Sequence, residues 1–302
     1  MKPASMCPTC KKFRSLSGHL FELSEYCRFL DNESKYKRHG QVRVVKTKVI
    51  SDWLKLASQL EKVEIDAWKF TDDSSSRYCR PVADEHDSNS KHFTAYSTVL
   101  TRFMFISNAL EETYRFVDRF YLSSEGVSEL PENKKLREAS LRATTLADNL
   151  ASDNLPKYFK HIVNNLHLTF EYYCSELNPA LTGMSGVEED QNSYGLHIVR
   201  NIRNHIAHGV FPIIDNPEYW GEEETRDKLI ALLFHASRVS CLYIQALIFK
   251  YNNGFQSDDY SIISEMNWDE ETYFIDNCKV ELALQLHIDS DFSFESPVAN
   301  EC

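Results

Sequence analysis

The stretch NSYGLHIVRNIRNHIAHG, residues 192–209, has the pattern of a single amphipathic helix. Ile198, Ile202 and Ile206 recur at every fourth position, so they share one face of a helix with about 3.6 residues per turn. Gly209 follows the last of these positions and is a natural helix stop. We therefore expect a helix that buries its isoleucine face and exposes a strip of arginine, asparagine and histidine side chains.

The rest of the chain is also dominated by helical patterns. Long segments with helical periodicity occur at residues 93–122, 132–150, 155–177 and 222–251. Glycine and proline, with nine residues each, are scarce, as they are in mostly helical chains. Five helices with short connections predict an all-α fold built as a helical bundle.

We divide the 302 residues into three regions. Residues 1–92 form an N-terminal, mostly helical extension of unassigned role, with a helix over 49–70 and a polar linker over 71–90. Residues 93–255 form the helical domain. Residues 256–302 form an acidic C-terminal segment that is irregular or contains a short strand at KVELALQL.

The net charge of −12 is unevenly distributed. Residues 256–302 contain twelve acidic residues against one lysine, so the rest of the chain is nearly neutral. The acidic total is therefore weak evidence against a nucleic-acid partner, since a neutral body can still hold a basic cleft. No apolar run reaches the ~18–20 residues of a membrane span, and the first residues lack an apolar signal core. We expect a cytoplasmic protein without a membrane partner, and its eight cysteines reduced.

Two overlapping Arg-Asn-x-x-x-His patterns lie on the helix over 192–209. The first runs from Arg200 to His205 and the second from Arg203 to His208. On a helical wheel His208 lies near the polar pole, whereas His205 lies close to the buried isoleucine stripe. The second pattern is therefore favoured as the functional one. Arg203 lies far from His208 on the wheel. The two can converge within one protomer through the long arginine side chain and a loosened last turn, or both copies can line one cleft if this helix packs beside its copy in a homodimer. Arg200 lies nearer to His208 and is a candidate phosphate contact.

The segment RNHIAHG at the end of a bundle helix resembles the signature of the HEPN superfamily (higher eukaryotes and prokaryotes nucleotide-binding). The glycine after the last histidine is similar to the Apea-like and related bacterial branches. The segment TRFMFISNALEETY, residues 101–114, resembles the first core helix of the family, with Glu111 or Glu112 as its glutamate. The resemblance covers roughly residues 93–251 and leaves the N-terminal extension and the acidic segment outside.

The resemblance implies a metal-independent endoribonuclease that acts on RNA as a homodimer. Such proteins serve as toxins of toxin–antitoxin pairs or as antiviral effectors, so an antitoxin or regulatory protein is an expected partner. No cofactor is then required for catalysis. The expected products are a 2′,3′-cyclic phosphate and a 5′-hydroxyl end.

The residue types suit this chemistry. An imidazole, with a reference pKa of ~6.5, exchanges protons near neutral pH, so we assign His208 as the acid/base catalyst. A guanidinium stays charged and binds phosphate oxygens in a forked geometry, so Arg203 is assigned as the transition-state stabiliser. Asn204 shares the face of His208 and is assigned as the residue that orients it. The predicted substrate contacts are Arg200, Asn201 and His197.

Two other functional interpretations remain open. The chain is alternatively a catalytically silent HEPN-like module that binds a nucleotide or a protein. The polar strip is then a solvated face, and a histidine near a helix C-terminus stabilises the helix dipole. The acidic segment 256–302 is also a candidate inhibitor that mimics nucleic acid in a basic cleft.

The segment CPTC, residues 7–10, is half of a zinc site by its spacing. The candidate ligands of a structural zinc ion are Cys7, Cys10, His19 and Cys27. The ordinary alternative is a pair of surface thiols. His161 and His167 lie six residues apart on a predicted helix, too far round to share one metal, and are expected to be structural.

Overall fold

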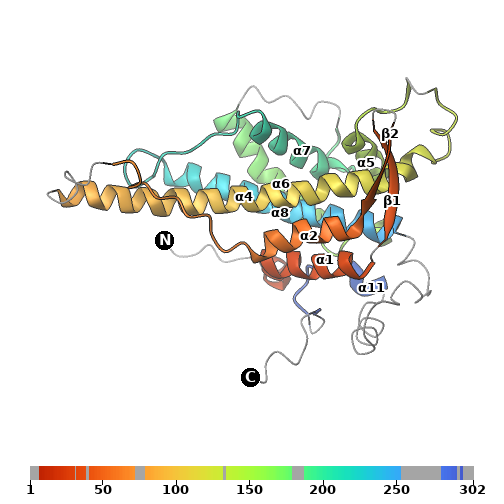
Figure 1. The fold of residues 1–302 in the computed structure, drawn as a ribbon, viewed down its shortest axis with the longest axis horizontal. Coiled ribbons are helices and arrows are strands. Elements are labelled where there is room, and N and C mark those ends of the chain that lie inside the picture. Colours follow the sequence, from red (N-terminus) through yellow and green to blue (C-terminus); the bar gives the residue numbers. More distant parts are fainter. Residues whose placement is uncertain are drawn as a thin grey trace.

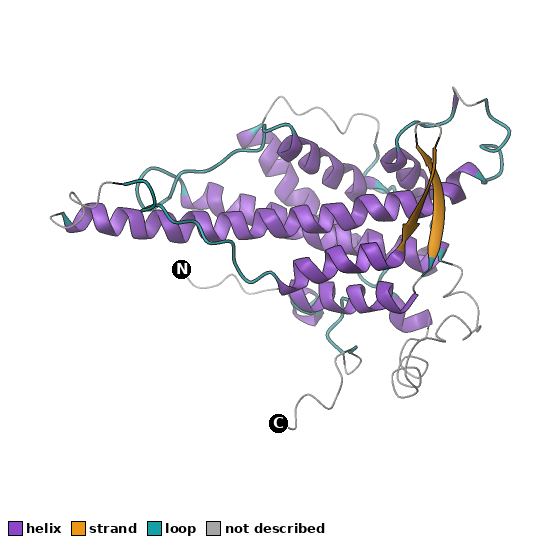
Figure 2. Cartoon of the chain, viewed as in Figure 1, coloured by secondary structure: helices purple, strands orange, loops and turns teal. Residues whose placement is uncertain are grey.

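The computed structural model describes residues 7–30, 32–38, 41–71, 79–131, 134–178, 187–252, 280–290 and 293–294. The described chain is mostly helical, as the sequence predicts, with a single two-stranded sheet (Figures 1 and 2). The main helices are α1 (Leu16–Leu30), α2 (Thr47–Gln59), α4 (Arg80–Leu122), α5 (Ala139–Asp148), α6 (Phe159–Tyr172), α7 (Tyr194–Ala207) and α8 (Glu223–Tyr251).

Helix α8 lies at the centre of the hydrophobic core. Helices α1, α4, α6 and α7 pack against it, and every residue from Ala236 to Phe249 is buried. Among the described helices, α8 alone is long and apolar enough to cross a membrane, but 89% of its most apolar 18-residue window is buried inside the fold. Such all-round burial is the usual environment of a core helix.

Helix α4 is the longest described element and runs along the long axis of the molecule (Figure 1). It begins at Arg80, so the predicted linker over residues 71–90 is wrong in its second half. Pro81 lies in the first turn, where its missing N–H group costs no intrahelical hydrogen bond. The proposed boundary between residues 92 and 93 falls inside this helix. The helical periodicity of residues 93–122 puts Leu100, Phe103, Ile106 (or Ser107), Leu110 and Tyr114 on one stripe. All of these are buried except Leu100, which is partly buried.

Residues 60–66 lie outside any helix or strand and run along α4, and a turn follows at residues 67–70, where the sequence predicted the end of a helix over 49–70. Alternate backbone N–H groups of this segment donate to hydroxyl groups on every fourth residue of α4. The pairs are Val63 with Thr98 at 2.8 Å, Ile65 with Thr94 at 2.9 Å and Ala67 with Ser90 at 3.0 Å. Two extended residues span roughly 6.6 Å and four helical residues about 6 Å, so the two spacings match.

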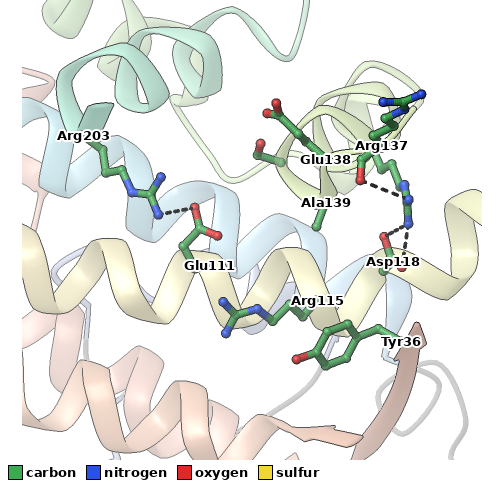
Figure 3. Close-up of a pocket in the computed structure, with 10 residues that line it drawn as sticks. Tyr36, Glu111, Arg115, Asp118, Arg137, Glu138, Ala139 and Arg203 are labelled. Atoms are coloured by element: carbon green, nitrogen blue, oxygen red, sulfur yellow. Dashed lines mark hydrogen bonds and ion pairs between the residues drawn. The ribbon is translucent and has the colours of Figure 1, made fainter. Parts of the chain in front are cut away.

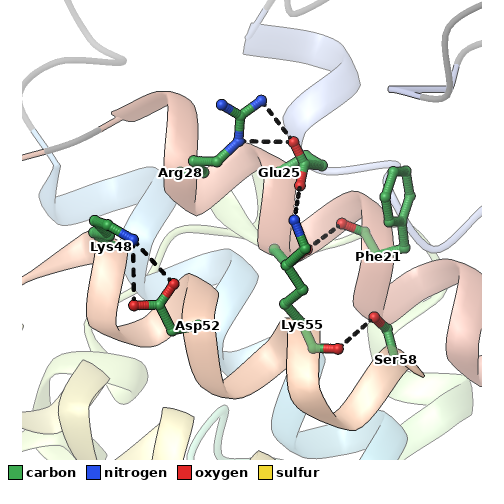
Figure 4. A network of polar contacts seen from close by, with 8 residues as sticks. Phe21, Glu25, Arg28, Lys48, Asp52, Lys55 and Ser58 are labelled. Carbon is green, nitrogen blue, oxygen red and sulfur yellow. Dashed lines mark hydrogen bonds and ion pairs between the residues drawn. The ribbon is translucent and has the colours of Figure 1, made fainter. Parts of the chain in front are cut away.

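Helices α1 and α2 pack against each other and join the same core. Glu25 of α1 is largely buried at their contact, and its carboxylate is ion-paired with Arg28 at 2.8 Å and with Lys55 of α2 at 3.9 Å (Figure 4). Because buried apolar residues of α1 and α2 belong to the same core as those of the bundle, the N-terminal region packs as part of the bundle.

Strands β1 (Glu33–Arg38) and β2 (Gln41–Lys46) form an antiparallel hairpin that the sequence analysis did not predict. Strand β1 packs against α4. On β2, Val45 is buried, whereas Val42 and Val44 are 67% and 50% exposed. Val45 therefore points to the buried face of this strand, and Val42 and Val44 point to the solvent face. With valines on both faces, the sequence lacks the alternation of apolar and polar residues that predicts a strand.

Two further helix boundaries differ from the sequence prediction. Helix α5 begins at Ala139 rather than near residue 132, and α6 begins at Phe159, after Tyr158 with a positive φ of 61°. The segment KVELALQL contains one helical turn, α11 (Val280–Ala283), instead of a strand. Most of residues 256–302 lie outside the described residues.

His19 of α1 and His287 form a buried pair of imidazole rings, with centroids 5.6 Å apart. Burial lowers the pKa of His287 to about 4, against a partial rise from its hydrogen bond to the Lys157 carbonyl. Burial, with the nearby Arg238 guanidinium, also lowers the pKa of His19 well below its ordinary value. Both rings are therefore neutral in the folded chain and gain a proton more readily on unfolding.

We expect the free energy of unfolding to fall as the pH drops from about 6.5 toward 4. Over this range His19 and His287 bind protons in the unfolded chain but stay neutral in the folded chain. For His287 the loss reaches about 3 kcal/mol below its folded pKa. Urea unfolding at several pH values measures this slope. The variant His287→Gln keeps a donor for the Lys157 carbonyl and should have a shallower slope. An unchanged slope in that variant would contradict the assignment.

Candidate functional site: the polar face of helix α7

Helix α7 separates a buried apolar face from an accessible polar face. Ile198, Val199 and Ile202 are buried, and Ile206 packs against the core from a half-buried position. His208 follows the last helical residue and is exposed, whereas His205 is half-buried. This confirms the predicted placement of the two histidines. Gly209 ends the helix with a positive φ of 68°, a conformation that favours glycine.

His205 is held by the end of α6. Its Nδ1 atom lies 2.9 Å from the Tyr173 hydroxyl and 3.5 Å from the Asn178 amide nitrogen. The Tyr173 ring stacks on Phe211, which follows α7. Partial burial, and secondly the nearby His208, lower the pKa of His205. His205 therefore anchors α7 to α6 as a neutral ring, which is a packing role.

The two arginines of the motif reach toward neighbouring carboxylates. Arg203 pairs with Glu111 of α4 at 3.1 Å, and Arg200 pairs with Glu138 at 2.6 Å. Of the two glutamates considered in the sequence, Glu111 is thus the one that contacts the motif. The Arg203 guanidinium also donates to the Asn204 side-chain oxygen at 3.4 Å. The side chain of Arg203 keeps 38% of its surface exposed, so it remains accessible to an anion.

A charged cleft of about 350 Å³ lies beside Arg203, between α4, the start of α5, α7 and β1. Its lining residues are Tyr36, Glu111, Arg115, Asp118, Arg137, Glu138, Ala139, Ser140, Arg142 and Arg203 (Figure 3). Four arginines face three carboxylates, so the cleft carries both signs of charge. Arg137 is exposed at its rim. The cleft can receive a phosphate group if the group competes with the carboxylates for the guanidinium groups.

The other predicted substrate contacts lie on the same helix. Asn201 and His197 are half-buried. Partial burial lowers the pKa of His197, as does the nearby Arg200, while Asp148 opposes this. His197 is therefore disposed to act as a neutral hydrogen-bonding group.

The structure separates the four candidate zinc ligands. Cys7 and Cys10 lie together beside His161 of α6. His19 instead contacts the Gln245 side chain at 3.1 Å, and Cys27 is fully buried in the core, where burial raises its pKa. His161, expected to be structural, is thus the third member of the cysteine cluster.

The sequence analysis missed the cleft and most of its charged residues. A signal was present in the segment EETYRFVD of α4, where Glu111, Arg115 and Asp118 recur at three- or four-residue spacing within an apolar helix. Such spacing places charges on one helix face. Nothing local to that segment indicates that Arg142 and Arg203 meet the same face.

Comparison of the chain with protein-family models, with curated proteins and with solved structures finds no match.

Proposed function

We propose that this chain is a metal-independent endoribonuclease with a HEPN-like helical bundle, acting as a homodimer in the cytoplasm. The observation that carries the proposal is the arrangement of α7. Arg203, Asn204 and an exposed His208 lie within six residues at the end of one short helix, whose apolar face is buried at Ile198, Val199 and Ile202. An accessible imidazole and an accessible guanidinium are the groups that cleavage of RNA without a metal requires.

In the proposed reaction, one imidazole takes the proton of the ribose 2′-hydroxyl. The 2′-oxygen then attacks the adjacent phosphorus, and the bond from phosphorus to the 5′-oxygen breaks. A second, protonated imidazole gives its proton to the leaving 5′-oxygen. Arg203 binds the phosphate oxygens as negative charge builds, and Asn204 orients the reacting groups. The products are a 2′,3′-cyclic phosphate and a 5′-hydroxyl.

A dimer supplies what one chain lacks. The reaction uses one imidazole as base and another as acid, and His205 is occupied by Tyr173. Arg203 also reaches toward α4, whereas His208 lies beyond the helix end. The His208 side chains of two subunits, with both copies of Arg203, would complete the set. Arg200, Asn201 and His197 are then proposed RNA contacts, and an antitoxin or regulatory protein is the proposed partner of a toxin or antiviral effector.

The direct test is RNA cleavage by the purified chain in EDTA. We expect cleavage to persist in the chelator, because no step of the proposed reaction uses a metal ion. Enzymatic mapping of the new ends should find 2′,3′-cyclic phosphates and 5′-hydroxyls. Cleavage that requires added Mg²⁺, or that leaves 5′-phosphates, would contradict the mechanism.

The cleft beside Arg203 favours a second candidate, a catalytically silent module that binds a nucleotide or a protein. Both motif arginines are already ion-paired within the chain, and the cleft of about 350 Å³ offers further arginines to a phosphate. This candidate predicts nucleotide binding without any RNA cleavage.

Glu111 competes with a bound phosphate for Arg203 in both candidates. The variant Glu111→Gln should therefore bind a non-cleavable RNA or a nucleotide up to about fivefold more tightly, since a partly exposed ion pair contributes up to about 1 kcal/mol. Fluorescence anisotropy measures the dissociation constant. Glu64→Gln is the matched control, because Glu64 pairs with Lys62 and neither residue lines the cleft. Equal effects of the two changes would show that Glu111 does not restrain Arg203.

A further inference from the structure

The N-terminal cysteine pair meets a histidine of α6 in a compact cluster. The Sγ atoms of Cys7 and Cys10 lie 3.1 Å apart, and the Nε2 atom of His161 lies 3.5 Å from the first and 3.3 Å from the second. All three residues are half-buried, and their ligand atoms lie within 4.8 Å of one another. The two cysteines are separated from the histidine by about 150 residues of chain, so the fold itself brings them together.

The dimensions of this cluster suit a zinc ion. Zinc binds thiolate sulfur at about 2.3 Å and imidazole nitrogen at about 2.0–2.1 Å in tetrahedral geometry, which sets ligand atoms roughly 3.5–3.8 Å apart. The two sulfur–nitrogen distances nearly match this spacing already. The two sulfurs need to separate by only about 0.6 Å, which a small rotation about χ1 within the same rotamer supplies.

Two N–H donors reach the cysteine sulfur atoms. The backbone N–H of Cys10 donates to the Cys7 sulfur at 3.2 Å. The side-chain amide of Asn165, one turn after His161 on α6, donates to the Cys10 sulfur at 3.7 Å. Donors to ligating sulfur atoms orient metal ligands and offset their charge.

We propose that Cys7, Cys10 and His161 bind one zinc ion, with a water molecule in the fourth position. Two thiolates and one imidazole form a donor set that zinc accepts readily. This ligand set differs from the one that the sequence predicted, Cys7, Cys10, His19 and Cys27. His161 of α6 takes the place of His19 and Cys27.

The bound ion would join two distant parts of the chain, and a third segment already hydrogen-bonds to both of them. Residues 7–14 carry the cysteines and also hydrogen-bond to the segment 284–289, through Arg14 N–H to the His287 carbonyl at 3.0 Å and Asp289 N–H to the Lys12 carbonyl at 2.8 Å. The start of α6 carries His161, and Lys157 just before it donates to the Leu284 carbonyl at 3.2 Å. The zinc ion therefore locks the N-terminal segment onto the bundle.

This role is independent of the proposed RNA cleavage. His161 lies near the start of α6, whereas Tyr173, which holds His205 of α7, directly follows the other end of that helix, about 18 Å away. Loss of the ion should loosen the N-terminal segment without removing a group from the polar face of α7.

The test is metal analysis of the full chain, purified under reducing conditions through a tag that binds no metal. Elemental analysis should find one zinc per chain in the wild type, falling at least tenfold in Cys10→Ser and His161→Ala. Cys79→Ser and Cys174→Ser, which change free thiols elsewhere, should keep full zinc content. Zinc retained equally in all four variants, or iron or copper found in its place, overturns the proposal.

Cobalt titration of the zinc-free wild type gives a second measurement that needs no variant. One equivalent of Co²⁺ should produce thiolate-to-cobalt charge-transfer absorption and the intense visible bands of a tetrahedral site, and zinc should displace it. A wild type without zinc and without these bands overturns the proposal. The proposal is also overturned if protein purified under reducing conditions contains a Cys7–Cys10 disulfide in place of a metal complex. RNA cleavage, present or absent, does not affect either outcome.

Discussion

Replacement of His208 by alanine is expected to lower the rate of RNA cleavage by about 10²–10⁴-fold, the usual contribution of a general acid–base catalyst. The fold should be unaffected, because His208 is exposed and follows the last residue of α7. Single-turnover cleavage of a labelled RNA gives the rate, and thermal unfolding gives the stability. A loss of cleavage with an unchanged melting temperature assigns the imidazole to the reaction.

His205 provides the matched control on the same helix. The variant His205→Asn keeps a polar atom near the Tyr173 hydroxyl, and we expect cleavage within a few fold of the wild type. The stability of this variant should fall somewhat, since the ring also packs against Tyr173. If His205→Asn abolishes cleavage while His208→Ala does not, the first Arg-Asn-x-x-x-His pattern is the functional one.

The same variants test the dimer. A dimer of one wild-type and one His208→Ala subunit holds a single His208, so a reaction that uses both copies should be lost in it. In mixtures whose random subunit exchange is verified by native mass spectrometry, cleavage should then fall as the square of the wild-type fraction. A fall in direct proportion to the wild-type fraction would place each site within one chain.

The sequence predicted those parts of the fold whose residues signal locally. The burial of α7 and of the α4 stripe follows from helical periodicity, and the different exposures of His205 and His208 follow from the same wheel. The end of α2 was missed because the apolar spacing continues past Gln59, through Leu60 and Val63, although the chain there is not helical.

The missed features depend on partners far away in the sequence. The segment 60–67 is held by hydroxyl groups of α4, about 20 to 40 residues later, and no local pattern reveals such donors and acceptors. The ion pair of Arg203 with Glu111 and the contact of Cys10 with His161 were missed for the same reason, because the two residues of each pair are far apart in the sequence. Periodicity identifies which face of a helix is buried, but not which side chains meet across helices.

The ion pair between Asp118 of α4 and Arg142 of α5 is expected to have the largest effect on stability. Asp118 is only 2% exposed, and Arg142 binds both of its oxygens, at 2.7 and 2.9 Å. Burial raises the pKa of Asp118, and the Arg142 guanidinium opposes that rise. Removing Arg142 leaves a buried carboxylate without its partner, which costs about 3–5 kcal/mol in comparable sites.

Urea unfolding of Arg142→Met at neutral pH should show this loss relative to the wild type. An exposed pair on α2 supplies the control, since Lys48 and Asp52 are both more than half exposed and Asp52→Ala should change stability by less than about 0.5 kcal/mol. The double variant Asp118→Leu/Arg142→Met should recover much of the loss, because no buried charge remains. Equal, small effects of Arg142→Met and Asp52→Ala would show that the pair is effectively solvated.

The pH dependence of Arg142→Met separates a charge effect from a packing effect. A carboxyl group whose folded pKa lies above its unfolded value stabilises the fold when protonated, and that stability is lost as the pH rises through the folded pKa. Without Arg142 the folded pKa of Asp118 should rise further, so the deficit of the variant should be largest at neutral pH and shrink toward acid. A deficit that is constant with pH would instead reflect lost contacts of the Arg142 side chain, which also donates to the Leu136 carbonyl at 2.6 Å. Because Asp118 and Arg142 line the cleft beside Arg203, a charge effect would also mean that a buried carboxylate holds Arg142 in place in the cleft.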